Sequence, residues 1–310
     1  MEEYGLKKPA LVVILGATAS GKSALGIALA QHFAGEIVSA DSRQVYRGLD
    51  IGTAKVTPAE QALVPHHLLD VADPQDIYTV SQFQHDAIAA INTILARGRQ
   101  PFLVGGSPHY IQAVVDNLDI PHVPPQLELR AELEVRPLPD LLAQLAELDP
   151  QSAATIDRSN PRRILRALEV CLVTGKPFSE QRRIHHPLYT TLMLGIQWPR
   201  DVLYERIDMR IDERMQQGLA EEVENLLAGH LTHERLEAMG LEYRFVSRWL
   251  RGEFIDKAEM VQRLKYATHD FVRRQLSWFR KDRRIQWING GEHVEQEADT
   301  FVSTFLSETA

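Results

Sequence analysis

The stretch from Leu15 to Gly26, LGATASGKSALG, contains the pattern G-x-x-x-x-G-K-[ST] at Gly16-Ala17-Thr18-Ala19-Ser20-Gly21-Lys22-Ser23. A continuous apolar run, PALVVILG (9–16), precedes it, and a helix-like segment, KSALGIALAQHF (22–33), follows it. A loop between a buried strand and a helix is the setting that this pattern requires. There, backbone N–H groups and the positive end of the helix bind an anion. The stretch therefore predicts a loop that binds phosphate groups.

Two side chains extend what the loop backbone can bind. Lys22 can reach an outer phosphate, and the hydroxyl of Ser23 can bind Mg²⁺. ATP is the common ligand of such loops, but the pattern alone does not say which diphosphate is bound. The neighbouring segments have to decide that question.

Strand-like segments alternate with helix-like segments after the loop. The further strands expected are GEIVSADS (35–42), PHHLLDV (65–71), PFLVGGS (101–107) and TLMLGIQWP (191–199). This alternation predicts an α/β fold, a P-loop NTPase-like three-layer α/β/α architecture with a mostly parallel sheet. Ligands of such sheets bind at the carboxyl ends of the strands, here near Gly16, Asp41 and Gly105.

Past Asp119 the chain becomes proline-rich and then helical in period. We expect a small all-α insert at 119–187 within a core made of 1–118 and 188–310. After the strand at 191–199 the chain is expected to be helical almost to its end. One of these helices should pack one side, formed by Val261, Leu264, Thr268, Phe271, Val272, Gln275 and Phe279.

Composition limits the classes of protein to be considered. The 310 residues are 44% hydrophobic and 25% charged, which suits a globular protein with a large core. The single cysteine, Cys171, excludes an intrachain disulfide, favours a reducing cytoplasmic location, and is expected to be a buried helical residue. The first apolar run is too short for a signal peptide or a membrane span.

The charge is unevenly distributed along the chain. The net charge is −8, yet residues 158–183 carry seven basic against two acidic residues, and residues 244–284 carry twelve against five. These two stretches would give an acidic protein a basic face that suits a polyanion. Two solvated helices are the alternative, and charge alone does not decide between them.

Two further segments lie at predicted strand ends. SADSRQVYRGLDIGTAK (39–55) brings Asp41, which could bind Mg²⁺ or act as a general base, toward the phosphate site. GGSPHY (105–110) brings the hydroxyl of Ser107 to the same crevice.

Taken in order, these segments resemble the tRNA dimethylallyltransferase (tRNA isopentenyltransferase) family of bacterial type. The resemblance runs from about residue 9 to about residue 282. The matching blocks are GATASGKS, DSRQVYRGLDIGTAK, PHHLLDVADP, RRILRALEVCLVTGKPFS and RRQLSWFRKD.

The resemblance implies that the loop holds dimethylallyl diphosphate rather than ATP. The five-carbon group would pass to N6 of the adenosine 3′-adjacent to the tRNA anticodon (position 37), with Mg²⁺ as cofactor. The core with its carboxyl-terminal helices and the insert would both contact the anticodon stem-loop. The family also implies a cytoplasmic monomer.

The family's functional residues map onto this chain where the blocks match. The resemblance implies catalytic roles for Asp41, Ser107, Lys22 and Arg210, diphosphate binding by Gly16 to Ser23, and metal binding by Ser23. For Arg210 the alternative is a solvated helix face, because Arg206 and Arg214 recur with it at helical spacing. The residues implied in tRNA binding are Asp41, Ser42, Arg43, Gln44, Arg162, Arg163, Arg166, Arg273, Arg274, Gln275 and Arg280. For Trp278 we favour a core position over a base-stacking one.

The chain departs from the family pattern at several positions. GGSPHY carries Ser107 at the family's threonine and His109 at an apolar position. Glu242 stands at a glycine of the family. The other departures are Asn160 for aspartate, Phe245 for a polar residue, His269-Asp270 for Arg-Gln, and a shorter insert. These positions bear on anticodon-loop contact more than on the donor side.

Three other functions compete with this interpretation. An adenylate isopentenyltransferase shares the donor half but prenylates AMP, ADP or ATP; the basic carboxyl-terminal helix favours tRNA instead. A small-molecule or nucleotide kinase would not explain the DSRQVY run. A non-catalytic RNA-binding protein would not need Lys22, Ser23 and Asp41 together.

Overall fold

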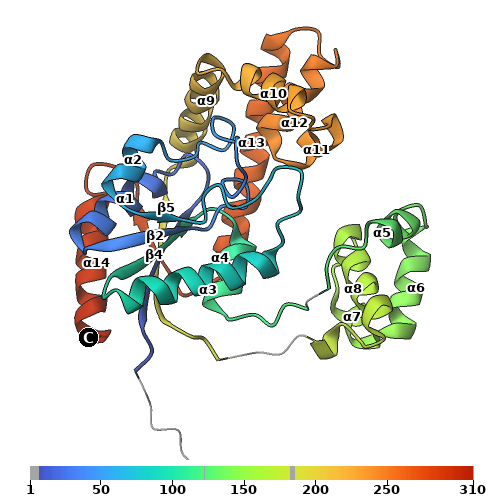
Figure 1. Ribbon diagram of the computed structural model, residues 1–310, viewed down its shortest axis with the longest axis horizontal. Helices are drawn as coiled ribbons and strands as arrows, with labels where there is room; N and C mark the ends of the chain where they lie inside the picture. The colour runs from blue at the N-terminus through green and yellow to red at the C-terminus, as the bar shows by residue number, and fades with distance from the viewer. Residues whose placement is uncertain (1–6, 122, 182–185, 310) are drawn as a thin grey trace, which may run out of the picture. The chain divides into compact units, whose positions relative to one another are not determined.

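The computed structural model describes residues 7–121, 123–181 and 186–309 (Figure 1). The chain divides into two compact units. The larger consists of Met1–Val115 and Leu188–Ala310, and the smaller is Asp116–Pro187. The two units are described separately below.

The larger unit is built on a six-stranded sheet in the order β3-β2-β4-β1-β5-β6, and every paired strand is parallel to its neighbour. The strands are β1 (Ala10–Gly16), β2 (Gly35–Ser39), β3 (His66–His67), β4 (Gln100–Gly105), β5 (Thr190–Gln197) and β6 (Ile285–Asn289). A parallel sheet needs cover on both faces, which explains why β1 is an unbroken apolar run. The predicted α/β fold with a parallel sheet is confirmed.

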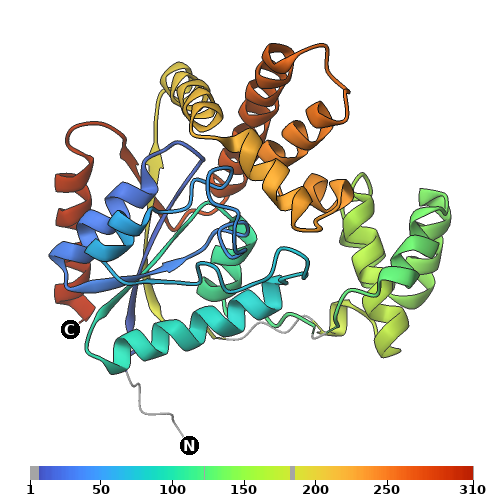
Figure 2. The same cartoon turned by 45° about the horizontal axis from the view of Figure 1, so that its top comes forward.

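Helices cover the two faces of this sheet (Figures 1 and 2). Leu11, Val13 and Leu15 pack with α3 and α4 on one face, whereas Val12 and Ile14 pack with α1 and α14 on the other. This division follows from the alternation of side chains along a strand. The helices of this unit are α1 (Lys22–His32), α2 (Pro58–Leu63), α3 (Val80–Ala96), α4 (Pro108–Val115), α9 (Arg200–Gln216), α10 (Leu219–Ala228), α11 (His233–Ala238), α12 (Leu241–Leu250), α13 (Lys257–Phe279) and α14 (Val294–Thr309).

Helices α9 to α13, gold to red in Figure 2, gather beyond one end of the sheet. A separate apolar cluster holds them to the loops there, with Tyr46 and Leu49 from the segment after β2 and Tyr243 from α12. A second cluster joins Ala17 and Ala19 of the phosphate loop to α9 and α13. These clusters place helices from the carboxyl-terminal third directly against the loops that follow β1 and β2.

The smaller unit is all helical. Its helices are α5 (Leu127–Glu134), α6 (Leu138–Leu148), α7 (Pro150–Thr155) and α8 (Pro161–Thr174), followed by a 3-10 turn, Ser179–Gln181. Glu169 of α8 is fully buried and forms ion pairs with Arg130 at 2.7 Å and Arg166 at 2.6 Å, besides accepting a bond from the Gln126 N–H. Burial alone would raise the pKa of Glu169, but these bonds hold it below its usual value. Cys171 is buried in α8, as expected.

Three sequence expectations about secondary structure are wrong. The strand expected at 65–71 shrinks to His66–His67, because Leu68 and Asp70 take positive φ angles of 63° and 56° that end the extended run. Strand β6 lies in a region expected to be helical. It is five residues long, too short a run for its hydrophobic periodicity to be recognised, and among the described strands it pairs with β5 alone. Phe271 is 40% exposed, because the buried stripe of α13 passes through Val272 instead.

Within the described residues, the search for a helix long and apolar enough to cross a membrane finds none.

Candidate active site

The phosphate loop links β1 to α1 at the carboxyl end of the sheet. Gly16 is packed so closely that a Cβ atom there would lie 2.7 Å from Ser20 Oγ and 3.2 Å from the Ile196 carbonyl oxygen, so the first glycine is sterically required. Gly21 caps α1 with a φ of 97°, which favours glycine. The loop therefore turns tightly and presents its backbone at the positive end of α1.

Side chains from the start of α9 close the loop from outside. Arg206 donates from Nε to the Ala19 carbonyl at 3.0 Å, and its guanidinium lies over the Trp198 ring at 4.5 Å. The indole N–H of Trp198 bonds to the Ser20 carbonyl at 2.9 Å. The loop and α9 together enclose a pocket of about 340 Å³, and Arg210 lines it with Lys22 and Ser23. Arg206 and Arg210 of α9 thus line a pocket beside the loop rather than a solvated helix face.

Two of the three cations that line this pocket, Lys22 and Arg210, are in a desolvated environment. Burial lowers the pKa of Lys22 to about 8; Arg210 and Arg214 act in the same direction, and Asp41 acts against them. Burial and the charge of Arg214 lower the pKa of Arg210 to about 10. Desolvation is the larger cause for both groups, and each also lies near another positive charge, an arrangement that a bound polyanion would stabilise.

Asp41 and Ser107 lie just past the carboxyl ends of the neighbouring strands β2 and β4. The Oδ1 atom of Asp41 accepts a bond from the Arg43 N–H at 2.9 Å. The Ser107 hydroxyl oxygen accepts the Ser42 N–H at 3.0 Å, and the Ser107 N–H bonds back to the Ala40 carbonyl at 3.2 Å. The charge of Asp41 raises the pKa of Lys22 against the effect of burial, so the two side chains lie close enough to interact electrostatically.

Gln275 of α13 ties the two glycine loops together. Its Oε1 atom accepts the Thr18 N–H at 3.3 Å, and its Nε2 atom donates to the Gly106 carbonyl at 2.7 Å. The residue is only 7% exposed. The sequence resemblance assigned Gln275 to tRNA, whereas in the structure its amide bridges the phosphate loop and the loop that carries Ser107.

We expect Gln275→Leu to raise KM for the prenyl donor by about tenfold, because a bridge of two hydrogen bonds, each contributing roughly 1 kcal/mol, no longer holds the phosphate loop. Steady-state kinetics with varied donor measures this effect. Gln262→Leu, at an exposed position of the same helix, is the control. An unchanged donor KM in Gln275→Leu would contradict the bridging role.

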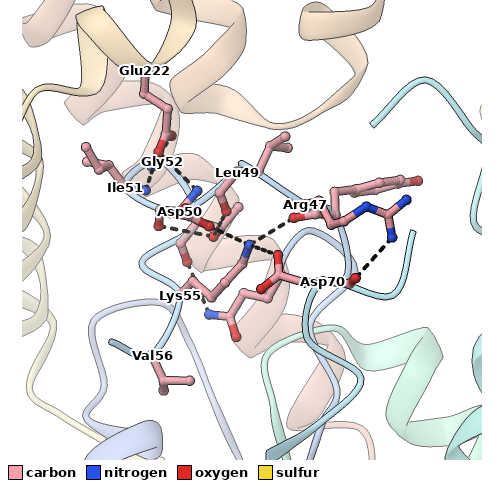
Figure 3. A network of polar contacts seen from close by, with 12 residues as sticks. Arg47, Leu49, Asp50, Ile51, Gly52, Lys55, Val56, Asp70 and Glu222 are labelled. Atoms are coloured by element: carbon pink, nitrogen blue, oxygen red, sulfur yellow. Dashed lines mark hydrogen bonds and ion pairs between the residues drawn. The ribbon is translucent and has the colours of Figure 1, made fainter. Parts of the chain in front are cut away.

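The segment 44–56 is held by two charged side chains (Figure 3). Lys55 Nζ contacts Asp50 at 2.6 Å, Asp70 at 2.5 Å and the Tyr46 carbonyl at 2.9 Å. Glu222 of α10 accepts the N–H groups of residues 50, 51 and 52 at 3.0, 2.7 and 3.0 Å. Sequence analysis missed Glu222, because nothing in α10 itself indicates that its carboxylate caps a turn more than 170 residues away.

Gln44, another residue assigned to tRNA, is 9% exposed, and its amide bonds inside this same segment. The nitrogen donates to the carbonyls of Thr53 and Ala54 at 3.3 and 3.1 Å, while its oxygen lies 3.3 Å from Ser39 Oγ. Gln44 thus contributes to the shape of the segment that follows Asp41.

The basic residues of α13 lie on its exposed side. Arg273, Arg274 and Lys281 line a depression of about 390 Å³ with Trp278, and Arg273 also pairs with Asp270. Arg280, which follows the last residue of the helix, lines a second depression of about 430 Å³ that shares Arg273 and Ser277 with the first. Trp278 is partly buried against the core and makes an edge contact with His109 at 5.8 Å, so it has both core and surface character.

In the smaller unit the three arginines of α8 differ. Arg162 and Arg163 are exposed, whereas Arg166 is drawn to the buried Glu169 and the Pro121 carbonyl. Arg182 and Arg183, which contribute to the basic stretch, lie outside the described residues.

We expect Arg166→Ala to destabilise the insert by about 2 kcal/mol, because it removes one of the two cations that pair with a buried carboxylate. Arg162→Ala should leave stability unchanged and reduce RNA affinity, together with its salt dependence, by about one phosphate contact. Thermal unfolding and RNA binding at two salt concentrations separate the two effects. Equal loss of stability in both variants would contradict this division of roles.

Comparison with known proteins identifies the family of this chain. Residues 44–282 match the family model of IPP transferases. A tRNA dimethylallyltransferase of Roseiflexus sp. (strain RS-1) is 46% identical over 301 residues, which is 96% of this chain and 98% of the relative. One of Streptomyces coelicolor is 46% identical over 288 residues, 91% of each chain.

Solved structures agree as well. The tRNA isopentenylpyrophosphate transferase of Bacillus halodurans superimposes with a TM-score of 0.74 at 35% identity, covering 97% of this chain and 98% of its own. A eukaryotic dimethylallyltransferase, captured acting on tRNA, has a TM-score of 0.82 at 26% identity, covering 97% and 80%. The chain therefore belongs to the IPP transferase family, the prenyltransferases that include the tRNA dimethylallyltransferases.

Proposed function

We propose that this protein transfers a dimethylallyl group from dimethylallyl diphosphate to N6 of the adenosine 3′-adjacent to the tRNA anticodon, giving N6-isopentenyladenosine and diphosphate. The observation that carries the proposal is the phosphate pocket walled by Arg206 and Arg210, with Asp41 close enough to act electrostatically on Lys22. Relatives of the chain are named tRNA dimethylallyltransferases, and the proposal includes a cytoplasmic location.

Asp41 supplies the acceptor half of the chemistry. The exocyclic amine of adenine is a weak nucleophile because its lone pair is conjugated with the ring. As N6 attacks C1 of the donor, the C1–O bond to diphosphate breaks and the nitrogen gains positive charge. The carboxylate takes the departing N6 proton and relieves that charge. The Arg43 N–H fixes one carboxylate oxygen, which leaves the other for the substrate.

The phosphate pocket supplies the leaving-group half. Backbone N–H groups of the loop, Lys22 and Arg210 stabilise the negative charge that grows on the departing diphosphate. These donors are in place before reaction, because Arg206 and Gln275 fix the loop from two sides. The Ser107 hydroxyl, held near Asp41, is placed to bond the adenine edge.

The donor set suits Mg²⁺ held mainly by the substrate. Among the described residues no group of three or more His, Cys, Asp or Glu side chains could hold a metal by itself. Ser23, in the pocket beside Lys22, offers one hydroxyl oxygen, and Mg²⁺ commonly completes its shell with phosphate oxygens and water. Bound in this way, Mg²⁺ would neutralise charge on the diphosphate.

Exposed cations supply the RNA half. Arg274 and Arg280 on α13, and Arg162 and Arg163 on α8, carry charge that phosphates can neutralise. The target adenosine has to leave its stack to reach Asp41. Ser42 and Arg43, directly after Asp41, are placed to contact the flipped nucleotide.

The test is a competition between acceptors. The full chain is incubated with Mg²⁺ and labelled dimethylallyl diphosphate, with unmodified tRNA and an AMP/ATP mixture offered in parallel. We expect the label on an adenosine beside the anticodon. Label on AMP or ATP would make the protein an adenylate isopentenyltransferase, which shares the donor site. Label on neither acceptor would overturn both, and ATP turnover would then test the kinase alternative.

A further inference from the structure

Helix α9 carries a third arginine behind the two that wall the phosphate pocket. Arg206, Arg210 and Arg214 are spaced four residues apart and therefore lie along one side of the helix. Arg206 and Arg210 line the pocket, whereas Arg214 does not line it and is only 6% exposed. A buried arginine needs partners, because an uncompensated charge in the interior is strongly unfavourable.

Arg214 has an ion-pair partner on another helix. Its Nη1 atom lies 2.6 Å from Oε1 of Glu242 on α12, and the two side chains are 7% and 18% exposed. Compensation is incomplete, because the Nε–H of Arg214 is buried and has no acceptor among the described residues. Glu242 also stands where the family block has a glycine, and its carboxylate binds Arg214 in the structure.

The charge of Arg214 reaches the pocket. Arg214 lies one helical turn from Arg210, which lines the pocket. It is the largest charge effect on Arg210, whose pKa it lowers, while Glu242 acts on Arg210 in the opposite direction. The other charged groups facing this site are Asp41, Arg206, Glu60 from α2 and Glu213 from α9. Arg214 and Glu242 thus stand behind the pocket and act on it through space.

We propose that Arg214 is a further cation of the donor site, and that Glu242 sets how much of its charge the diphosphate experiences. The inference rests on the proposed function, since it assumes that the pocket binds a diphosphate. Arg214 does not line the pocket, so its charge attracts the anion from a distance rather than by contact. If the ion pair only fastened α9 to α12, the loss of either partner would have the same effect on diphosphate binding.

The two substitutions are therefore expected to change the affinity for diphosphate in opposite directions. Arg214→Met removes a positive charge from behind the pocket, and Glu242→Gln removes the negative charge that offsets it. The double variant Arg214→Met/Glu242→Gln leaves the net charge as it was. Binding of inorganic diphosphate with Mg²⁺ is measured by titration calorimetry on the full chain at fixed ionic strength. Asp212→Asn is the control, because Asp212 lies on the same helix but pairs with Lys265 of α13 at 2.7 Å.

We expect Arg214→Met to bind diphosphate at least about tenfold more weakly than Glu242→Gln, because the two variants differ by two charges that act on a multiply charged anion across a protein interior. Glu242→Gln should bind more tightly than the wild type, and the double variant should lie between the single variants. Single variants that both weaken binding to the same extent, or that leave it unchanged, would overturn the inference.

Circular dichroism establishes that each variant is folded at the assay temperature. If Arg214→Met does not fold, Arg214→Lys replaces it: the lysine keeps the charge and should bind like the wild type, with Glu242→Gln tighter than both. Weaker binding by Glu242→Gln than by the wild type would then overturn the inference. If the wild-type chain binds no diphosphate, the proposed donor site itself is wrong. That outcome differs from one in which the wild type binds diphosphate but both single variants change its affinity in the same way.

Discussion

Replacing Asp41 with asparagine lowers kcat for prenyl transfer by about 10²- to 10⁴-fold, the range typical of losing a general base, and leaves donor binding nearly unchanged. Asparagine keeps an oxygen that can accept the Arg43 N–H, bonded at 2.9 Å in the structure, so the local backbone is preserved. What disappears is the negative charge that accepts the N6 proton. Single-turnover rates with tRNA, together with calorimetric binding of the donor, separate the two effects.

Asp73 provides a matched control for this substitution. Its Oδ1 atom accepts the Gln75 N–H at 2.9 Å, the same local bond that Asp41 makes with Arg43, but Asp73 lines a different depression, with Gly48 and Glu222. Asp73→Asn should therefore retain wild-type turnover. If Asp41→Asn also turned over normally, Asp41 would not be the base, and the proton would have to leave by another route.

Replacing Glu222 with alanine destabilises the protein by about 3 kcal/mol and lowers kcat/KM. The carboxylate accepts three backbone N–H groups of residues 50–52 and the hydroxyl of Tyr243 at 2.8 Å (Figure 3). Hydrogen bonds to a charged acceptor contribute roughly 1.5–3 kcal/mol each, and water can replace only those at the exposed edge. Loss of the turn loosens the segment that leads back to Asp41, so activity falls with stability.

Urea unfolding and steady-state kinetics on the same preparations measure both consequences. Glu224→Ala is the control, since Glu224 lies on the same helix, two residues away, and is exposed. A Glu222→Ala variant as stable as Glu224→Ala would show that the turn at 50–52 holds itself. Unchanged kcat/KM in a destabilised Glu222→Ala variant would show that the turn at 50–52 does not influence the segment that carries Asp41.

The sequence by itself determined the features that depend on residues close together in the chain. A buried apolar run, two glycines at fixed spacing and a following helix predict the phosphate loop, because backbone sterics and the helix dipole act over a few residues. The alternation of strands and helices predicted the parallel sheet. Parallel topology in turn placed Gly16, Asp41 and Ser107 at one end of it. The resemblance to a family then implied a donor, dimethylallyl diphosphate, where the loop pattern left the ligand open.

Only the tertiary structure decided which polar side chains serve the site and which serve the fold. The family resemblance implies tRNA binding for Gln275 and Gln44. In the structure, the side-chain amide of each donates a hydrogen bond to a backbone carbonyl of the protein instead. Glu222 and the Arg214–Glu242 pair carried no local signal, because their partners lie on other elements. The physical reason is that a hydrogen bond or an ion pair depends on burial and distance, which packing of helices α9 to α13 against the loops creates.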